Sequence, residues 1–253
     1  AAMNAPAISV VTVCRNPGKE LPAAAASVRA ALGAGDEWVV QDGASTDGTA
    51  DFLRGLADAR VRSESRPDGG IYDAMNRAAA RAQGDYLLFL GADDRLRIHL
   101  DEARGFLKDV RTVYYGDVWR PATGDRYAGA FDGAKLARTN ICQQAIFYPR
   151  AAFAGRAFDV RYPQQADWVF NMDCFADPAL TFEYVPLLVA DFAQGGASSL
   201  RMDEAFQRDY RRLLKKYFPF RQRWRPALAC ALAEFYRALP GVPAPRQTPA
   251  RAR

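Results

Sequence analysis

The sequence Gly84-Asp85-Tyr86-Leu87-Leu88-Phe89-Leu90-Gly91-Ala92-Asp93-Asp94 decides how this chain folds. Its five apolar residues, 86–90, are bounded by polar residues and glycines, which is typical of a buried central strand. Two adjacent carboxylates follow, although like charges repel and each prefers water or a cation. Ligands of open α/β sheets bind at the carboxyl ends of the strands. The pair therefore indicates either a Mg²⁺ or Mn²⁺ site with a phosphate ligand or a solvated turn.

Strands and helices alternate along the residues before this stretch. The pattern predicts strands at 8–13, 37–42 and 61–65 and helices at 21–32, 49–56 and 71–81. Such alternation predicts an α/β fold, with a mostly parallel sheet flanked by helices. The sequence contains neither a GxGxxG fingerprint after the first strand nor a GxxxxGK[ST] loop. Phosphates would then be held in another way, and a metal ion at Asp93 and Asp94 provides one.

The second half of the chain is less regular. It contains predicted strands at 113–119, 126–131, 144–148 and 182–192 and predicted helices at 165–175, 202–218 and 228–239. A polar loop is expected at 194–199. The segment 241–253 is rich in Pro, Ala and Arg, which is typical of a disordered tail.

Composition excludes several kinds of site. The four cysteines, at positions 14, 142, 174 and 230, form no CxxC pair, and His99 is the only histidine. This argues against a zinc site and against a histidine-based catalytic triad. The sequence shows no signal peptide and no run of 18 apolar residues. We therefore expect a cytoplasmic protein with free thiols.

Basic charge gathers at the C-terminal end. Residues 201–253 carry 13 Lys and Arg and 4 Asp and Glu, a net charge of +9, whereas the whole chain has +5. This region could lie on an anionic membrane surface, bind nucleic acid, or pack on the rest of the protein. Phe218, Phe220 and Trp224 favour the membrane, and with it a peripheral location on the inner face of the cytoplasmic membrane.

Four motifs in the first half resemble those of the family 2 glycosyltransferases, which have the GT-A fold. They are Val10-Val11-Thr12-Val13, the stretch Val40-Gln41-Asp42-Gly43-Ala44-Ser45-Thr46-Asp47-Gly48-Thr49, the block Asp68-Gly69-Gly70-Ile71-Tyr72-Asp73-Ala74-Met75-Asn76, and Ala92-Asp93-Asp94. The third block is similar to that of the branch that builds bacterial surface polysaccharides. The resemblance covers residues 7 to 96 and is weaker beyond. Later, Gln165-Ala166-Asp167-Trp168 and Gly195-Gly196-Ala197-Ser198-Ser199 are similar to the family's acidic helix start and its G-G-x-S-S loop.

The resemblance implies a division of the chain. Residues 1–99 would bind the nucleotide sugar, and residues 100–200 would form the acceptor-binding and catalytic half of the same domain. A basic helical extension, 201–240, and the tail 241–253 would follow. The chain departs from the family at two places: the first Asp of an Asp-x-Asp motif is replaced by Gly91-Ala92, and Cys142-Gln143-Gln144 stands where relatives often carry a histidine.

The donor would be held by the first half. Asp94 is our candidate metal ligand, with Asp93 turned toward the ribose or sharing the metal. The resemblance implies that Asp42 accepts a hydrogen bond from the base or ribose, and the backbone after Thr12 would line the base. The alternative for Asp42 is a turn residue.

Two further donor contacts are candidates near the predicted helix at 71–81. Arg66 and Asp68 precede its N-terminus, which suits a phosphate because N–H donors and a partial positive charge gather there. Arg66 would add a charge-assisted contact. The alternative is a solvated loop arginine.

The acceptor hydroxyl must lose a proton as it attacks, and a carboxylate is the natural base in a chain with one histidine. Asp167 is the candidate, by its motif position and its place at a helix start, and the less favoured alternative is an N-cap aspartate. A single base and direct attack give inversion, which the resemblance also implies. Trp119, Tyr127 and Trp168 could stack on sugar faces or belong to the core.

These residues predict an inverting, metal-dependent glycosyltransferase that moves a sugar from a nucleotide donor, UDP by default, to a growing polysaccharide or lipid-linked glycan. A sugar nucleotidyltransferase would need a Gly-rich basic loop after the first strand, and Cys14-Arg15-Asn16-Pro17-Gly18 is a poor match. A glycoside hydrolase also uses two carboxylates, but an adjacent Asp pair does not suit it. A nucleic-acid- or membrane-binding module would leave the carboxylates at the strand ends unexplained.

Overall fold

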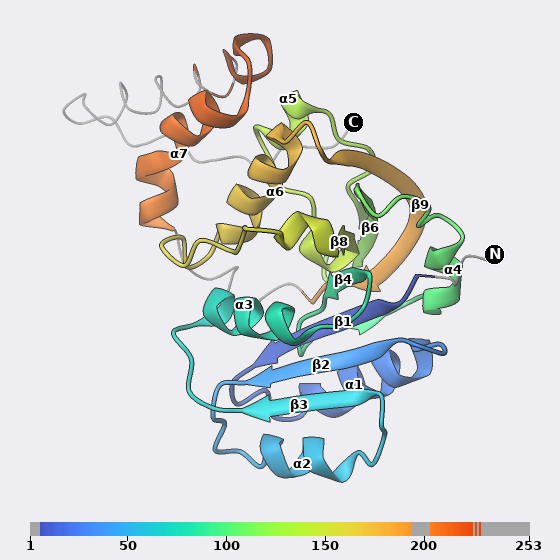
Figure 1. Ribbon diagram of the computed structural model, residues 1–253. Coiled ribbons are helices and arrows are strands. Elements are labelled where there is room, and N and C mark those ends of the chain that lie inside the picture. The colour runs from blue at the N-terminus through green and yellow to red at the C-terminus, as the bar shows by residue number, and fades with distance from the viewer. Residues whose placement is uncertain (1–5, 194–202, 225, 227, 229–253) are drawn as a thin grey trace.

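A computed structural model of the protein describes residues 6–193, 203–224, 226 and 228. Strands and helices alternate through the first half and then become irregular (Figure 1). The strands are β1 (Ile8–Cys14), β2 (Glu37–Asp42), β3 (Val61–Ser65), β4 (Tyr86–Phe89), β5 (Arg95–Leu96), β6 (Thr112–Arg120), β7 (Asp125–Tyr127), β8 (Ile146–Pro149) and β9 (Thr181–Asp191). The α-helices are α1 (Glu20–Ala31), α2 (Thr49–Gly55), α3 (Ile71–Arg81), α4 (Leu100–Arg104), α5 (Gly133–Leu136), α6 (Ala166–Ala176) and α7 (Glu204–Tyr217), and two 3-10 turns are η1 (Gln143–Ala145) and η2 (Arg150–Phe153).

One mixed sheet runs through both halves of the chain. Its order is β3-β2-β1-β4-β8-β6-β9-β5, with β7 paired to β6. The pairs among β1 to β4 are parallel, as is β6 with β9. Strand β8 is antiparallel to both β4 and β6 and so joins the two halves. The predicted fold class, an α/β fold with a mostly parallel sheet flanked by helices, is confirmed.

Alternate residues of each strand face opposite layers, as the pleat requires. In β4, Leu87 and Phe89 pack with α3 and α6, whereas Tyr86 and Leu88 pack with α1 and α4. This explains why the opening stretch is apolar without interruption: both faces of β4 are covered by helices. The carboxylates that follow it therefore lie at the edge of a core and not in a free turn.

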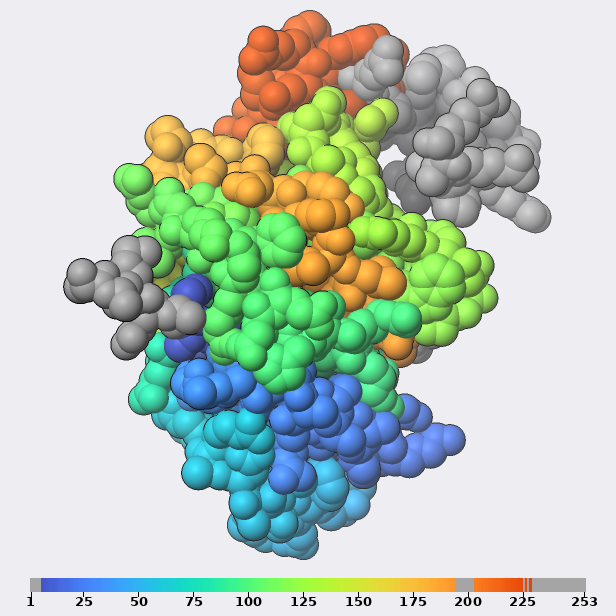
Figure 2. Space-filling view, turned by 90° about the vertical axis from the view of Figure 1, so that its right-hand side faces the viewer, coloured from blue at the N-terminus to red at the C-terminus, as the bar shows by residue number. Residues whose placement is uncertain are grey.

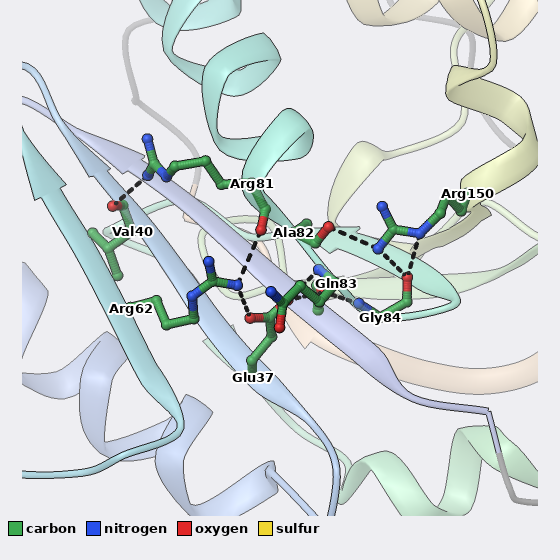
Figure 3. A network of polar contacts seen from close by, with 9 residues as sticks. Glu37, Val40, Arg62, Arg81, Ala82, Gln83, Gly84 and Arg150 are labelled. Carbon is green, nitrogen blue, oxygen red and sulfur yellow. Dashed lines mark hydrogen bonds and ion pairs between the residues drawn. The ribbon is translucent and has the colours of Figure 1, made fainter.

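The chain between α3 and β4 is held by two arginines, Arg62 and Arg150 (Figure 3). Arg150 donates to the carbonyls of Ala82 and Gly84, each at 2.7 Å, and Arg62 donates to the carbonyl of Arg81 at 3.0 Å. Arg62, whose own side chain is half-exposed, also pairs with the buried Glu37 at 2.8 Å. Cations at the C-terminal end of a helix satisfy carbonyls that have no partner within the helix. The contacts fix where β4 begins, and so where it delivers its carboxylates.

The predicted strand at 126–131 is too long, since β7 ends at Tyr127. The backbone turns away at Gly129, whose N–H donates to Asp117 at 2.6 Å, and the N–H of Phe131 donates to the hydroxyl of Tyr115 at 2.9 Å. Beyond Tyr127, the backbone therefore bonds to the side chains of Asp117 and Tyr115 and not to the backbone of a neighbouring strand. The predicted loop at 194–199, nearly all of the predicted helix at 228–239 and the tail 241–253 lie outside the described residues.

Helix α7 packs on α6 at the end of the molecule opposite α2 (Figure 1). Figure 2 shows the same separation from the side, with the blue-to-cyan residues around α2 at one end and the orange-red residues of α7 at the other. The buried residues of α7 are Phe206, Leu213 and Leu214. Their spacing places them on one face of the helix, which is why its basic residues lie on the outside.

Candidate active site

A cavity of about 1100 Å³ opens where β1 and β4 end. Its walls come from the loop after β1, the loop after β4, the starts of α3 and α6, the segment before η1, and the ends of β6, β7 and β9. The charged residues among its lining are Arg15, Glu20, Asp68, Asp93, Asp94, Arg120 and Asp167. Acidic groups therefore outnumber basic ones in a site at the carboxyl ends of parallel strands.

Asp94 is buried at the floor of this cavity, with 2% of its surface exposed. Its carboxylate accepts hydrogen bonds from the N–H groups of Gly91 and Ala193, at 3.0 and 2.8 Å, and from the amide of Gln144 at 2.9 Å. Burial, and then the negative charge of Asp93, raise the pKa of Asp94 to about 6, against these hydrogen bonds. A cation bound nearby would stabilise the ionised form of two carboxylates that lie this close together.

Both carboxylates fold back over Gly91. A Cβ at that position would lie 2.6 Å from Oδ2 of Asp94 and 2.7 Å from Oδ1 of Asp93, so a side chain there would push the two oxygens away. The glycine that replaces the first acid of an Asp-x-Asp motif therefore leaves the room that the remaining two acids occupy.

The residues fit a divalent cation that arrives with a diphosphate. No group of three or more His, Cys, Asp or Glu side chains able to hold a metal is found among the described residues. Mg²⁺ is usually bound by one or two carboxylates together with substrate phosphates and waters. Asp94 and the neighbouring Asp93 would supply the one or two protein carboxylates that such a site uses.

Asp167 lies in the wall formed by the start of α6. Its Oδ1 accepts from the hydroxyl of Tyr72 at 2.7 Å and its Oδ2 accepts from the amide of Asn140 at 2.7 Å. Burial raises the pKa of Asp167, and the hydrogen bond from Tyr72 acts in the opposite direction. A carboxylate whose pKa is raised toward neutrality is a stronger base when ionised.

Arg15 and Asp68 line the wall of the cavity next to Gly43. Both side chains approach Gly43, where a Cβ would lie 2.7 Å from Oδ2 of Asp68 and 3.4 Å from the Cβ of Arg15. Asp68 also accepts from the N–H of Gly70 at 3.0 Å, at the start of α3. Arg15 is exposed and forms no ion pair within the described part of the chain. It is therefore available to a bound anion.

Two of the predicted nucleotide contacts are covered by other residues. Thr12 is fully buried, and its hydroxyl accepts from the indole of Trp38 at 3.0 Å, whereas Val13 to Arg15 line the cavity. The carboxylate of Asp42 accepts from the hydroxyl of Ser65 at 2.5 Å and from the N–H of Ser45 at 3.1 Å. Asp42 thus stabilises the turn after β2, which is the alternative role that the sequence left open for it.

Three other predicted residues lie outside the cavity lining. Arg66 is exposed and pairs with Glu64 at 3.2 Å. Trp119 lies on β6, opposite Arg126 of β7. Trp168 stacks on Phe206 of α7 with ring centroids 5.0 Å apart, and its indole donates to the carbonyl of Leu136 at 2.8 Å. Trp168 is a partly buried residue at the edge of the core, where its ring packs against Phe206 and Tyr210 of α7.

Sequence reasoning missed four polar residues of the site: Tyr72, Arg120, Asn140 and Gln144. Tyr72 belongs to the motif block at 68–76 but faces Asp167, which is 95 residues away in sequence. The Arg120 guanidinium lies 5.0 Å from the ring centre of Tyr127, and that tyrosine does line the cavity. Only the pairing of distant segments reveals these contacts, so no local signal could have identified them.

Comparisons with known proteins agree with this geometry. Residues 9–121 match the family model described as glycosyl transferase family 2. A PGL/p-HBAD biosynthesis glycosyltransferase of Mycobacterium tuberculosis is 38% identical over 214 residues, which cover 81% of this chain and 84% of that protein. The chain belongs to glycosyltransferase family 2.

This glycosyltransferase also resembles solved GT-A structures in fold. TarS of S. aureus, residues 1–349, aligns with a TM-score of 0.68 and 16% identity over 91% of this chain and 72% of that one. GalNAc-T7, solved with UDP, GalNAc and Mn²⁺, aligns with a TM-score of 0.62 and 16% identity over 84% of this chain and 48% of that one. TarS has also been solved with UDP-GlcNAc, a match with a TM-score of 0.62 and 15% identity over 83% of this chain and 65% of that one.

Membership of this family favours a glycosyltransferase over the rival functions weighed from the sequence. Within the described part of the glycosyltransferase, no helix combines the length and the apolar character needed to cross a bilayer.

Proposed function

We propose that this glycosyltransferase moves a sugar from a nucleotide sugar, with UDP as the default nucleotide, to a lipid-linked or glycolipid acceptor, with inversion at the anomeric carbon. One observation carries the proposal: the carboxylates of Asp93 and Asp94 and the carboxylate of Asp167 line the same cavity. The first two suit a diphosphate with its cation, and the third suits an acceptor hydroxyl. A sugar bound between them would meet both partners.

The donor's diphosphate would lie above Asp93 and Asp94, with the nucleoside toward Arg15 and Asp68. A Mg²⁺ or Mn²⁺ ion bound there would neutralise the charge that grows on the leaving diphosphate. Arg15 would add a cation from the opposite wall, and Gln144 holds Asp94 in place through its 2.9 Å hydrogen bond. Arg66, Trp119 and Trp168 have no part in this arrangement.

Asp167 would act as the general base. As the acceptor oxygen forms its bond to the anomeric carbon, its O–H bond breaks and the proton passes to the Asp167 carboxylate. The bond between the anomeric carbon and the diphosphate breaks on the opposite side, and the diphosphate leaves with that electron pair. Attack from one face and departure from the other invert the anomeric carbon.

The acceptor class is inferred from the mycobacterial relative, whose printed name places it in PGL/p-HBAD biosynthesis. Exposed apolar residues at the cavity mouth, such as Ile71, which is 38% exposed, would suit an acceptor with an apolar portion. A protein that modifies lipid-linked acceptors would also benefit from contact with a membrane surface.

Donor and cofactor can be tested by thermal shift with a panel of nucleotide sugars, with and without Mn²⁺. We expect one nucleotide to stabilise the protein, and only with the metal, because both ligands share one site. Equal stabilisation without metal would contradict the metal's proposed place, and no stabilisation by any nucleotide sugar would contradict the function.

The base is tested by Asp167→Asn. This variant should keep its donor-dependent stabilisation and lose sugar transfer to a total lipid extract, as measured from the mass gained by the product. Asp173→Asn is the matched control, since Asp173 lies on the same helix, pairs with Arg156 at 2.8 Å and does not line the cavity. Full turnover by Asp167→Asn would overturn the assignment.

A further inference from the structure

A chain of polar side chains runs from the core to Asp167. The hydroxyl of Tyr148, on β8, donates to Oδ1 of Asn171 at 2.7 Å. The amide of Asn171, on α6, donates to Oδ1 of Asn140 at 2.8 Å, and the amide of Asn140 donates to Oδ2 of Asp167 at 2.7 Å. Tyr148 and Asn171 are fully buried. Burying an amide inside an aromatic core is unfavourable unless all its polar atoms are bonded, so the chain requires an explanation.

The direction of this chain is set at its buried end. A neutral tyrosine hydroxyl can donate one hydrogen bond and can also accept. Burial raises the pKa of Tyr148 well above its usual value, so it keeps its proton, and among the described contacts Asn171 is the acceptor that this buried proton meets. Asn171 therefore turns its oxygen toward Tyr148 and its NH₂ group toward Asn140. Asn140 must then present its own oxygen to Asn171 and its NH₂ group to Asp167. Neither amide can reverse without placing two donors or two acceptors against each other.

The opposite side of Asp167 is not fixed in this way. The hydroxyl of Tyr72 is 2.7 Å from Oδ1 of Asp167 but also 3.2 Å from the carbonyl oxygen of Gln164. It can donate to either acceptor. Of the two neighbours that donate to Asp167, Tyr72 has a second acceptor within reach, whereas the Asn140 amide is held in one orientation by Asn171 and Tyr148.

We propose that Tyr148 and Asn171 are positioning residues that orient the Asn140 amide as a fixed donor to the catalytic base. The inference rests on the proposed function, since it assumes that Asp167 takes the acceptor's proton. A permanent donor at Oδ2 favours the ionised carboxylate and holds its plane, so that a free lone pair faces the cavity. The arrangement keeps a buried acid ready to accept a proton, although its burial alone would favour the neutral form.

Other groups near Asp167 act on its charge as well, and the test must separate their effects. The titratable groups whose electrostatics involve Asp167 are Tyr72 on α3, Tyr148 on β8 and the Cys142 thiol before η1. Asp203 bonds the N–H groups of Gln164 and Gln165 just ahead of α6, at 3.0 and 3.1 Å. A substitution at Tyr148 leaves all the charged groups in place.

The decisive variant is Tyr148→Phe, which removes only the hydroxyl that sets the direction. Tyr86→Phe is the matched control: Tyr86 is also fully buried, and its hydroxyl donates to the carbonyl of Asp109 at 2.7 Å, but it faces the other layer of the core. The protonation of Asp167 is read from the infrared band of the neutral carboxyl group during a pH titration of the full chain, with Asp167→Asn as the blank.

In Tyr148→Phe we expect the Asp167 titration to move up by roughly half a pH unit or more, because the carboxylate loses a committed donor. The acidic limb of the transfer rate should move with it, with turnover reduced and the KM for the donor unchanged. Tyr86→Phe should lose similar stability and keep the wild-type titration. A wild-type titration in Tyr148→Phe would overturn the proposal. If Asp167→Asn were instead active, the base assignment itself would fail, whatever the titration shows.

Discussion

Asp94 illustrates how one residue can be both stabilised and strained by its surroundings. Three N–H donors point at its carboxylate, yet burial and Asp93 raise its pKa to about 6. The two acids have no cation of the protein between them in the described contacts. The residue is therefore arranged for a charge that comes with the substrate.

The first prediction concerns pH. Because the folded pKa of Asp94 lies above the unfolded value of about 4, its contribution to stability is present below about pH 4 and is lost as pH rises through about 6. Bound metal requires the ionised form, so the apparent Mn²⁺ affinity should fall about tenfold per pH unit below about 6. Thermal shift with Mn²⁺ and a UDP-sugar, whose diphosphate keeps its charge over this range, measures it. Equal affinity at pH 5 and pH 7 would contradict the prediction.

A second prediction concerns Gly91. Gly91→Ala would place a Cβ against Asp93 and Asp94, at the 2.6 and 2.7 Å approaches given above. We expect at least a roughly tenfold loss of metal-dependent donor binding with a folded protein, since one hydrogen-bonded contact to a charge is worth about 1.5–3 kcal/mol. Gly55→Ala is the control, because a Cβ there meets open space. If both variants bind donor as the wild type does, Gly91 has no such role.

At the scale of elements, the start of α6 is positioned by α7. Asp203 is 4% exposed and caps α7 through the N–H of Phe206 at 2.9 Å, while its other oxygen accepts the N–H groups of Gln164 and Gln165. The stack of Trp168 on Phe206 completes the contact. The helix that carries Asp167 is thus placed by a helix that contributes nothing to the cavity.

The third prediction follows from this contact. Asp203→Ala should lower the free energy of unfolding by about 2–4 kcal/mol, because one buried and two partly buried N–H groups lose their acceptor. It should also reduce turnover, since the start of α6 is released. Asp132→Ala, which removes only the exposed cap of α5 on Lys135, is the control. Denaturant unfolding measures the first effect and an assay of turnover the second. Unchanged turnover in a destabilised Asp203→Ala variant would show that α7 does not position the active site.

Many elements could be predicted at this scale, and their limits have a physical cause. The strands at 37–42 and 61–65 and the helix at 71–81 match β2, β3 and α3. Their patterns are local, because each strand or helix carries its own periodicity and breakers. The strand at 126–131 was too long because contacts from Tyr115 and Asp117 stop β7, and those contacts come from another strand.

At the scale of the whole molecule, exposed apolar residues and basic residues come together in the segment that follows α7. Phe220, Trp224 and Leu228 are 70%, 43% and 52% exposed and follow one another at helical spacing. Arginines at 221 and 223 lie between them. Apolar anchors among cations suit an anionic membrane surface.

The fourth prediction tests that surface. The double variant Phe220→Ser, Trp224→Ser should float with vesicles containing phosphatidylglycerol several-fold less than the wild type, and neither should bind neutral vesicles. Val110→Ser, Val160→Ser is the matched control, because these valines are 58% and 56% exposed elsewhere on the protein. Equal flotation of all three proteins, or salt-dependent binding to DNA in place of vesicles, would contradict the membrane assignment.

The sequence by itself determined the fold class and the family and indicated which acids are candidates, because apolar periodicity and the short motifs around Asp42, Asp68, Asp94 and Asp167 are local in the chain. Tertiary structure decided which of the predicted residues share a cavity. It kept Asp93, Asp94 and Asp167 together, packed Trp168 against α7 at the edge of the core, and brought Tyr72 and Asn140 to Asp167 from segments far apart in sequence. The reason is physical: a motif fixes a residue's own backbone and neighbours, whereas burial and hydrogen-bond partners depend on how strands and helices pack.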